Sequence, residues 1–336
     1  MKAFLPLMAV IFLILLVIAG VKAAGLYFLF GVVVPYAALA VFLAGVVFRV
    51  VKWGRSPVPF RIPTTCGQQK SLPWIKQNKI ENPSSSCGVI TRMLFEVFLF
   101  RSLFRNLKTE MYNGPEAHGG TKIAYGSDKW LWLGGLAFHW SMLIILIRHL
   151  RFFIQNVPAP VQMIEGLDSF LQIGLPLIYM TDVFFLGAVT YLLIRRFANP
   201  KVKYISLAAD YFPLLLLLGI GTTGVLMRYF LRVDIVSVKK FTMSLVALNP
   251  TIVPGISSVF YVHLFLISTL FAYFPWSKLV HLGGVFLSPT RNLANNSREK
   301  RHINPWNAPV KVHTYAEYED DFREKMKMAG LPVEKE

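Results

Sequence analysis

The sequence predicts an all-α membrane protein built as a bundle of six transmembrane helices. Of the 336 residues, 54% are hydrophobic and only 16% are charged, and the mean hydropathy is +0.50. The apolar residues also gather into runs long enough to cross about 30 Å of hydrocarbon, which takes about 20 residues of α-helix. The expected spans are residues 4–21, 26–50, 130–154, 169–194, 205–230 and 252–275.

The first apolar run has two interpretations. Lys2, the apolar residues after it and the small-residue sequence AGVKA resemble a signal peptide with its cleavage site. The apolar stretch resumes almost at once and continues to Val51, which favours a helical hairpin that turns near residues 20–25. We expect an N-terminal transmembrane hairpin over residues 1–52, with a cleaved first segment as the alternative.

The net charge of +17 is explained by the membrane rather than by nucleic acid. Basic residues flank membrane spans on the cytoplasmic side. Here they gather between the second and third spans, between the fourth and fifth spans, and in the tail. With six spans these regions lie on one side together with the N-terminus, so we expect both termini in the cytoplasm. Lys239 and Lys240, in an opposite connection, go against the trend.

Two polar regions flank an expected four-helix core at residues 129–284. The loop of residues 53–128 contains GVITRMLFEVFLFRSLFRNLK, which is too charged to span but suits a helix lying in the membrane interface. Its cysteines, Cys66 and Cys87, are too few to hold an iron–sulfur cluster alone, and their role stays open. The tail, residues 285–336, lacks an apolar core, so it is expected to drape over a partner or to be partly disordered.

Four of the seven histidines lie in or just past apolar segments of membrane length. His139 and His149 share the third span, His263 lies in the sixth, and His281 follows it. A histidine in hydrocarbon is costly and usually functional. Two pairs on two helices indicate two metal centres, and the simplest chemistry is a bundle holding two b haems, each with one histidine from each helix. The sequence has no CxxCH motif, so covalent haem is not indicated.

Non-redox alternatives explain less of the pattern. A single intramembrane histidine could bond across helices or serve a transporter as a proton relay. A transporter would place polar groups at broken helices, often in internal repeats, whereas this sequence has no clear repeat and few intramembrane charges. A passive anchor would explain the bundle and its basic face, but it would leave the four histidines unexplained.

Topology predicts how the histidines pair. The third and sixth spans are three crossings apart and therefore run in opposite directions. This pairs His139 with His281 on the inner haem iron, near the cytoplasm, and His149 with His263 on the outer haem iron. The two separations along the helix axes are about 15 Å and about 27 Å at about 1.5 Å per residue. The longer one requires tilt or a break, which Pro275 can supply.

The spacing H-x9-H followed by H-x17-H resembles that of the cytochrome b (gamma) subunit of respiratory nitrate reductase, over residues 125–285. That family's fold is a five-helix bundle with two b haems, to which this sequence adds an N-terminal span. The whole chain is more similar to the cytochrome b membrane subunits of the sulfate-reduction complex, the Hdr-like menaquinol oxidoreductases. That second similarity includes the chain length and the segment CGQQKSLPWIKQNKIENPSSS.

The resemblance implies a subunit of a quinol-dependent oxidoreductase complex in the prokaryotic cytoplasmic membrane. Such a subunit exchanges electrons between menaquinone or menaquinol and a cytoplasmic iron–sulfur subunit like that of heterodisulfide reductase, in sulfate or sulfite reduction. The chemistry at the acceptor end takes place in that partner, and further membrane and periplasmic cytochrome subunits are expected. A nitrate reductase-type gamma subunit is the alternative.

The resemblance also gives ligand and quinone-site candidates. The family's four ligand histidines correspond to His139, His149, His263 and His281. In nitrate reductase relatives a basic residue near the outer haem contributes to the quinol site, but no lysine follows His149 at a matching place. Arg148 and Arg151 are candidates for quinone contact; they could equally neutralise haem propionates or mark the helix end. Asp182 could accept a quinol proton, line a wet cavity, or be buried in its protonated form and hydrogen-bonded.

Overall fold

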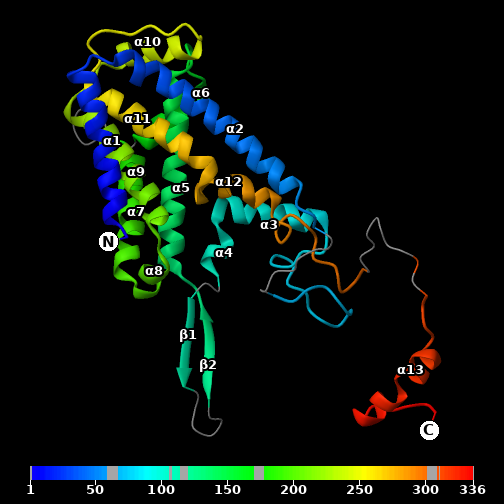
Figure 1. The fold of residues 1–336 in the computed structure, drawn as a ribbon. Helices are drawn as coiled ribbons and strands as arrows, with labels where there is room; N and C mark the ends of the chain where they lie inside the picture. The colour runs from blue at the N-terminus through cyan, green and yellow to red at the C-terminus, as the bar shows by residue number, and fades with distance from the viewer. Residues whose placement is uncertain are drawn as a thin grey trace.

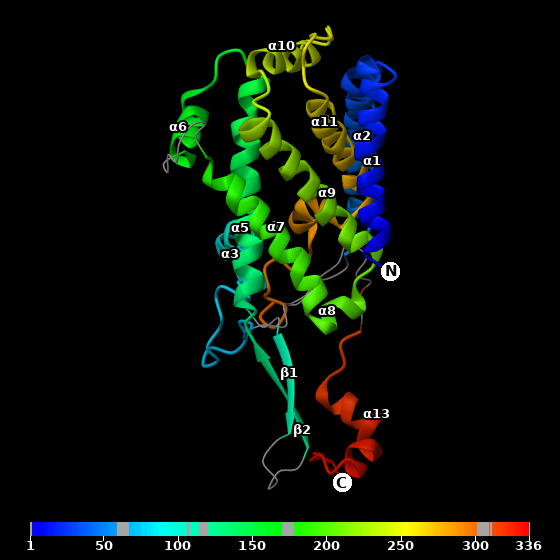
Figure 2. The same cartoon turned by 90° about the vertical axis from the view of Figure 1, so that its left-hand side faces the viewer.

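The long helices of the chain stand side by side in one bundle (Figures 1 and 2). A two-stranded hairpin projects from one end, called here the hairpin end, and the helix α10 (Ile235–Val246) covers the other, the α10 end (Figure 1). The computed structural model describes residues 2–58, 67–105, 108–113, 120–169, 178–300, 309 and 311–335.

Within the described part of the chain, five helices are long and apolar enough to cross a membrane. They confirm the predicted spans at 4–21, 26–50, 130–154, 205–230 and 252–275 to within a few residues. Four of them begin or end in a tighter or wider helical turn, labelled η. The five are α1 (Phe4–Lys22), η1 with α2 (Leu29–Gly54), α5 with η3 (Lys129–Phe152), α9 with η4 (Ala208–Phe230), and α11 with η5 (Ser258–Trp276).

The fourth predicted span, residues 169–194, differs from the structure. Residues 170–177 lie outside the described part of the chain, and the helix α7 runs over Met180–Ala198. Its first turn holds Asp182, predicted to be mid-helix, and its last turn holds Arg195 and Arg196, so composition does not mark it as a span. It nevertheless packs between α5 and α9 within the bundle (Figure 2).

Small residues bring the helices close together, as is usual between membrane helices. Gly134 of α5 lies against Tyr191 of α7, where an added Cβ would come within 2.6 Å of the ring. Gly45 of α2 meets Pro275 beyond α11 in the same way, also at 2.6 Å. At the centre of the bundle, α1 and α9 pack on α11 around side chains that have no exposed surface, such as Leu216 and Leu266.

Shorter elements fill the connections between the long helices. The amphipathic stretch of the predicted loop is helical, as expected. It forms α3 and, after a sharp corner, α4. The shorter helices and helical turns are α3 (Ser86–Leu99), α4 (Arg101–Phe104), α6 (Ala159–Asp168), α8 (Pro200–Ile205), η6 (Lys278–Val280), α12 (His281–Gly284), η7 (Val285–Leu287) and α13 (Tyr315–Met328).

Two elements depart from the predicted fold class and tail. The antiparallel strands β1 (Lys108–Asn113) and β2 (Thr121–Gly126) make the described fold mostly helical rather than all-α. In the tail, predicted to drape over a partner or to be partly disordered, the described residues 311–335 contain the helix α13. Thr314 and Glu317 begin that helix with a reciprocal capping box, which satisfies two of its free backbone N–H groups.

Substituting Gly134 tests the close packing of α5 on α7. We expect Gly134→Ala to destabilise the protein by about 1–3 kcal/mol, because the methyl group must displace the Tyr191 ring. Thermal unfolding in detergent should show a lower midpoint. Gly187→Ala on α7 is the matched control, since a Cβ added there meets nothing within 4 Å. An equal loss of stability in the control would contradict this packing.

Candidate haem-binding site

The two helices that carry the histidines run in opposite directions. The chain enters α5 at the hairpin end and α11 at the α10 end (Figure 1). α5 packs mainly on α7, while α11 packs on α1, α2 and α9, so the two helices pack on different neighbours rather than closely on each other.

A break after α11 positions His281. Proline lacks the backbone N–H that would continue a helix, and Pro275 lies in the short turn η5, after which Ser277 is extended. Arg49 of α2 donates from Nε to the Pro275 carbonyl oxygen at 2.8 Å and fixes the break. The His281 ring then lies 6.0 Å from the ring of His139, measured between centroids, with 86° between their planes.

Three of the histidines use Nδ1 in the same way. Each Nδ1 donates to a backbone carbonyl oxygen about one turn earlier in the chain, and a carbonyl can only accept. Nδ1 therefore carries the hydrogen, and Nε2 keeps a lone pair that can bind a metal. The distances are 2.7 Å from His139 to Gly135, 2.7 Å from His149 to Ile145, and 2.9 Å from His281 to Lys278.

His263 reaches the same state through a hydroxyl group. Its Nδ1 lies 2.9 Å from Oγ1 of Thr223 on α9. That oxygen is itself 2.8 Å from the Gly219 carbonyl and 2.9 Å from the Ile220 carbonyl, so its hydrogen is directed to the backbone. The hydroxyl oxygen is left to accept from the histidine.

This donor set fits a haem better than a bare metal ion. Within the described ranges, no group of three or more histidine, cysteine, aspartate or glutamate side chains could hold an ion. A pair of imidazoles supplies two ligands, and a porphyrin supplies the other four. The rings of His139 and His281 are close enough to act as such a pair. In all four histidines Nε2 keeps a lone pair that can bind a metal.

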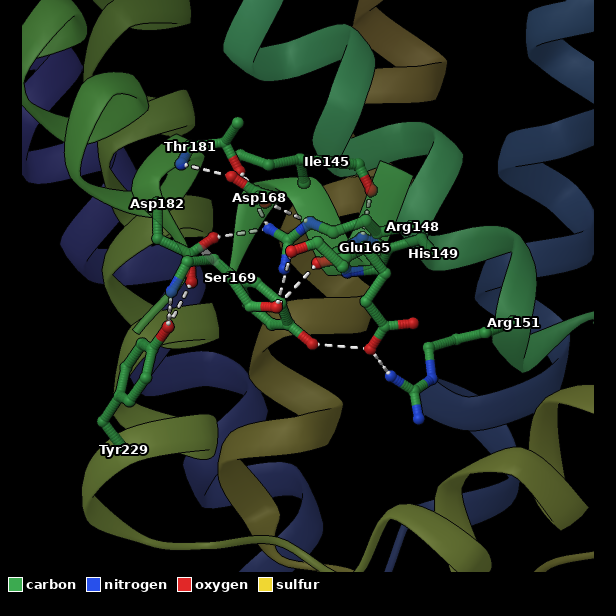
Figure 3. A network of polar contacts seen from close by, with 12 residues as sticks. Ile145, Arg148, His149, Arg151, Glu165, Asp168, Ser169, Thr181, Asp182 and Tyr229 are labelled. Carbon is green, nitrogen blue, oxygen red and sulfur yellow. Dashed lines mark hydrogen bonds and ion pairs between the residues drawn. The ribbon is translucent and has the colours of Figure 1, made fainter. Parts of the chain in front are cut away.

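A buried polar network lies beside His149 (Figure 3). Its centre is Arg148, whose side chain is only 8% exposed. The guanidinium forms ion pairs with Asp168 of α6 at 2.9 Å and with Asp182 of α7 at 2.8 Å. It also stacks 3.7 Å from the centre of the Tyr179 ring. One arginine thus joins the end of α5 to both following helices.

The carboxylates of this network also hold the start of α7. Asp168 accepts from the backbone N–H of Thr181 at 2.9 Å and from its hydroxyl at 2.6 Å, so it satisfies a free N–H in the first turn. Asp182 accepts from the Tyr229 hydroxyl at 2.8 Å, and that hydroxyl accepts from the backbone N–H of Tyr179 at 3.0 Å. A negative charge at a helix N-terminus is favourable.

A second ion pair lies nearer the surface. Arg151 pairs with Glu165 of α6, which also accepts from the Tyr179 hydroxyl at 2.6 Å. The Arg151 and Glu165 side chains are 33% and 24% exposed, well above Arg148. Tyr179 therefore connects the buried part of the network with its accessible part.

The structure brings the three quinone-site candidates into this one network. Arg148 and Asp182 form an ion pair, whereas the interpretation of Asp182 as buried and hydrogen-bonded assumed a protonated carboxyl, so the role of Asp182 stays a prediction. Sequence reasoning missed Glu165, Asp168, Tyr179 and Tyr229. No local signal in the sequence indicated them, because the expected span of residues 169–194 placed no helix start near Tyr179. Of the two cysteines, Cys87 is exposed and Cys66 lies outside the described residues.

Comparisons with known proteins agree with this arrangement. Residues 123–297 match the family described as nitrate reductase gamma subunit. The chain is 42% identical over 285 residues to a protein from Archaeoglobus fulgidus named Hdr-like menaquinol oxidoreductase cytochrome b-like subunit, covering 83% of each chain. A protein of the same name from Archaeoglobus profundus is 41% identical over 281 residues, covering 81% of each chain.

Removing the Arg148 charge tests the network. We expect Arg148→Gln to destabilise the protein by about 3–5 kcal/mol, because two buried carboxylates lose their counter-charge. Denaturation in detergent measures the loss. Arg151→Gln is the control, and as a partly exposed pair it should cost about 0–1 kcal/mol. Equal losses in the two variants would contradict the central role of Arg148.

Proposed function

Because the chain belongs to the nitrate reductase gamma subunit family, with Hdr-like menaquinol oxidoreductase cytochrome b-like subunits among its relatives, we propose that it is a dihaem cytochrome b subunit. It exchanges electrons between menaquinol and a cytoplasmic iron–sulfur subunit in sulfate or sulfite reduction. The observation that carries the proposal is the approach of His139 and His281, each with Nδ1 engaged and Nε2 available.

The geometry of the inner pair supports haem ligation. Imidazole nitrogens bind metal ions at about 2.0–2.1 Å. The 6.0 Å between the ring centroids of His139 and His281 would let both residues hold the same metal ion. We assign these two residues to the inner haem iron, and His149 with His263 to the outer haem iron.

The protein's own groups prepare the four ligands. Each Nδ1 hydrogen bond holds the imidazole in one tautomer and orientation and increases the basicity of Nε2. A bis-histidine haem, when bound, accepts and donates one electron at a time. His139, His149 and His263 are partly buried among apolar helices, whereas His281 is exposed. Ligands that are already oriented need little rearrangement when the charge of the site changes.

We place quinone contact beside the outer pair, at the accessible part of the polar network. Arg151 and Glu165 are the more exposed members, and Tyr179 adjoins both. Arg148 and Asp182 instead hold α5, α6 and α7 together beside His149. A hydroxyl of the quinol could then donate to Glu165, while Arg151 keeps that carboxylate in place.

The proposed topology has six spans: the five candidate helices, and α7 as the fourth span in chain order. α7 packs between the candidate spans α5 and α9 and has the same length as α1, so it is long enough to cross the bilayer beside them. Six spans put both termini and the hairpin end in the cytoplasm, and the iron–sulfur subunit would dock at that end. Further membrane and periplasmic cytochrome subunits complete the complex.

Haem content tests the proposal directly. We expect two b haems per chain in a pyridine haemochrome assay, because each histidine pair holds one. His139→Ala and His281→Ala should lose the same haem, and His149→Ala and His263→Ala the other. His313→Ala is the control and should keep both, since His313 is exposed near the start of α13. A common loss for His139→Ala and His263→Ala would refute the pairing.

Co-purification tests the partner. Removing residues 309–336 should weaken the recovery of an iron–sulfur protein from native membranes, because α13 extends the hairpin end into the cytoplasm. Both haems should stay in place. Arg101 and Arg105 are less suitable targets, since both pair with Glu81 and hold the loop together. Lys239→Glu at the α10 end is the control. Unchanged recovery after the truncation would contradict docking through the tail.

A further inference from the structure

The corner between α3 and α4 is strained. Phe100 forms it with φ 48° and ψ 45°, in the left-handed region. A bulky side chain rarely adopts this conformation, because its Cβ crowds the backbone. Such residues persist where the surrounding structure fixes them, and they cluster at functional sites.

Two tryptophans of α5 fix this corner in place. Trp132 donates from Nε1 to the Leu99 carbonyl at 2.7 Å, and Trp140 donates to the Phe98 carbonyl at 3.0 Å. Trp140 directly follows His139, and Trp132 lies about two turns before it. The corner is therefore attached to α5 on both sides of the histidine.

The strained residue points its ring at the inner pair. The Phe100 and His139 ring centroids are 4.7 Å apart, with 50° between the planes. The Phe138 ring lies 4.8 Å from the same imidazole. With His281 at 6.0 Å, the His139 imidazole is bordered by two phenyl rings and the second histidine. Phe100 comes from a separate connection and covers part of the His139 ring, while His281 is exposed.

The corner is also attached to the tail. Glu96 of α3 accepts from the backbone N–H of Ser102 at 3.3 Å and forms an ion pair with Arg291 at 2.6 Å. Arg92, only 2% exposed, donates to the backbone carbonyls of Arg291 and, at 3.0 Å, of Leu293. A continuous series of contacts thus leads from the tail to His139.

We propose that Phe100 is a positioning residue of the inner haem site, which orients His139 and keeps water from it, and that the tail holds Phe100 there through Glu96. This inference rests on the proposed function, since it concerns a haem held by His139. Its physical basis is that the apolar shell around a metal site controls solvent access and therefore the redox potential. Water stabilises the more highly charged oxidised form, so admitting water lowers the potential.

The test uses the full-length protein in its purified complex. Redox titration followed by visible spectra gives the midpoint potential of each haem, and low-temperature EPR reports the orientation of the axial imidazoles. We expect Phe100→Ala and Phe100→Gly both to lower the midpoint potential of the inner haem and to change its EPR signal. The outer haem should be unaffected. Glu96→Gln, which weakens the hold of the tail, should shift the potential in the same direction by less.

Two comparisons make the test decisive. Phe98→Ala removes an exposed ring that packs on Trp140 rather than on a histidine, and should change neither signal. Phe100→Leu keeps apolar cover and should restore most of the wild-type potential. Unchanged potential and EPR signal in Phe100→Ala, with both haems bound, would overturn the inference. Absence of haem from the wild-type protein would instead refute the proposed function.

Discussion

The need to satisfy polar groups inside the bundle governs this structure. Hydrocarbon offers no hydrogen bonds, so each polar atom at membrane depth must find its partner within the protein. The buried Arg148 has two carboxylates and an aromatic ring, and the hydroxyl of Thr223 has backbone carbonyls and a histidine. The histidines follow the same rule at Nδ1. Their Nε2 atoms are left available as ligands, and the rings of His139 and His281 lie together.

The break after α11 reconciles the unequal histidine spacings. On straight antiparallel helices, separations of about 15 Å and about 27 Å cannot match. The turns that begin at Pro275 shorten the path, and His281 meets His139 from a short helix of its own. The hydrogen bond from Arg49 and the close contact between Gly45 of α2 and Pro275 hold the break. The N-terminal hairpin therefore contributes to the position of His281, although it carries no histidine.

Hydropathy alone predicted five of the bundle's helices, because burial in lipid selects long apolar runs. It misplaced the start of α7, whose charged ends are stabilised by partners distant in sequence, such as Asp168 for the backbone of Thr181. The histidine positions were readable because each lies in an apolar run. The role of Tyr179 was not readable, because it depends on residues from α5 and α6 that meet only in the folded chain. The same holds for Phe100, whose left-handed conformation has no glycine to signal it.

The central claim is that two irons are each held by two imidazoles. Low-temperature EPR of the oxidised protein tests it most directly, because the spin state of ferric haem reports its axial ligands. The account predicts two low-spin ferric signals of equal intensity and no high-spin iron, since both axial positions of each haem are filled by histidine. A dominant high-spin signal, or a single low-spin signal in a sample with its full haem content, would contradict it.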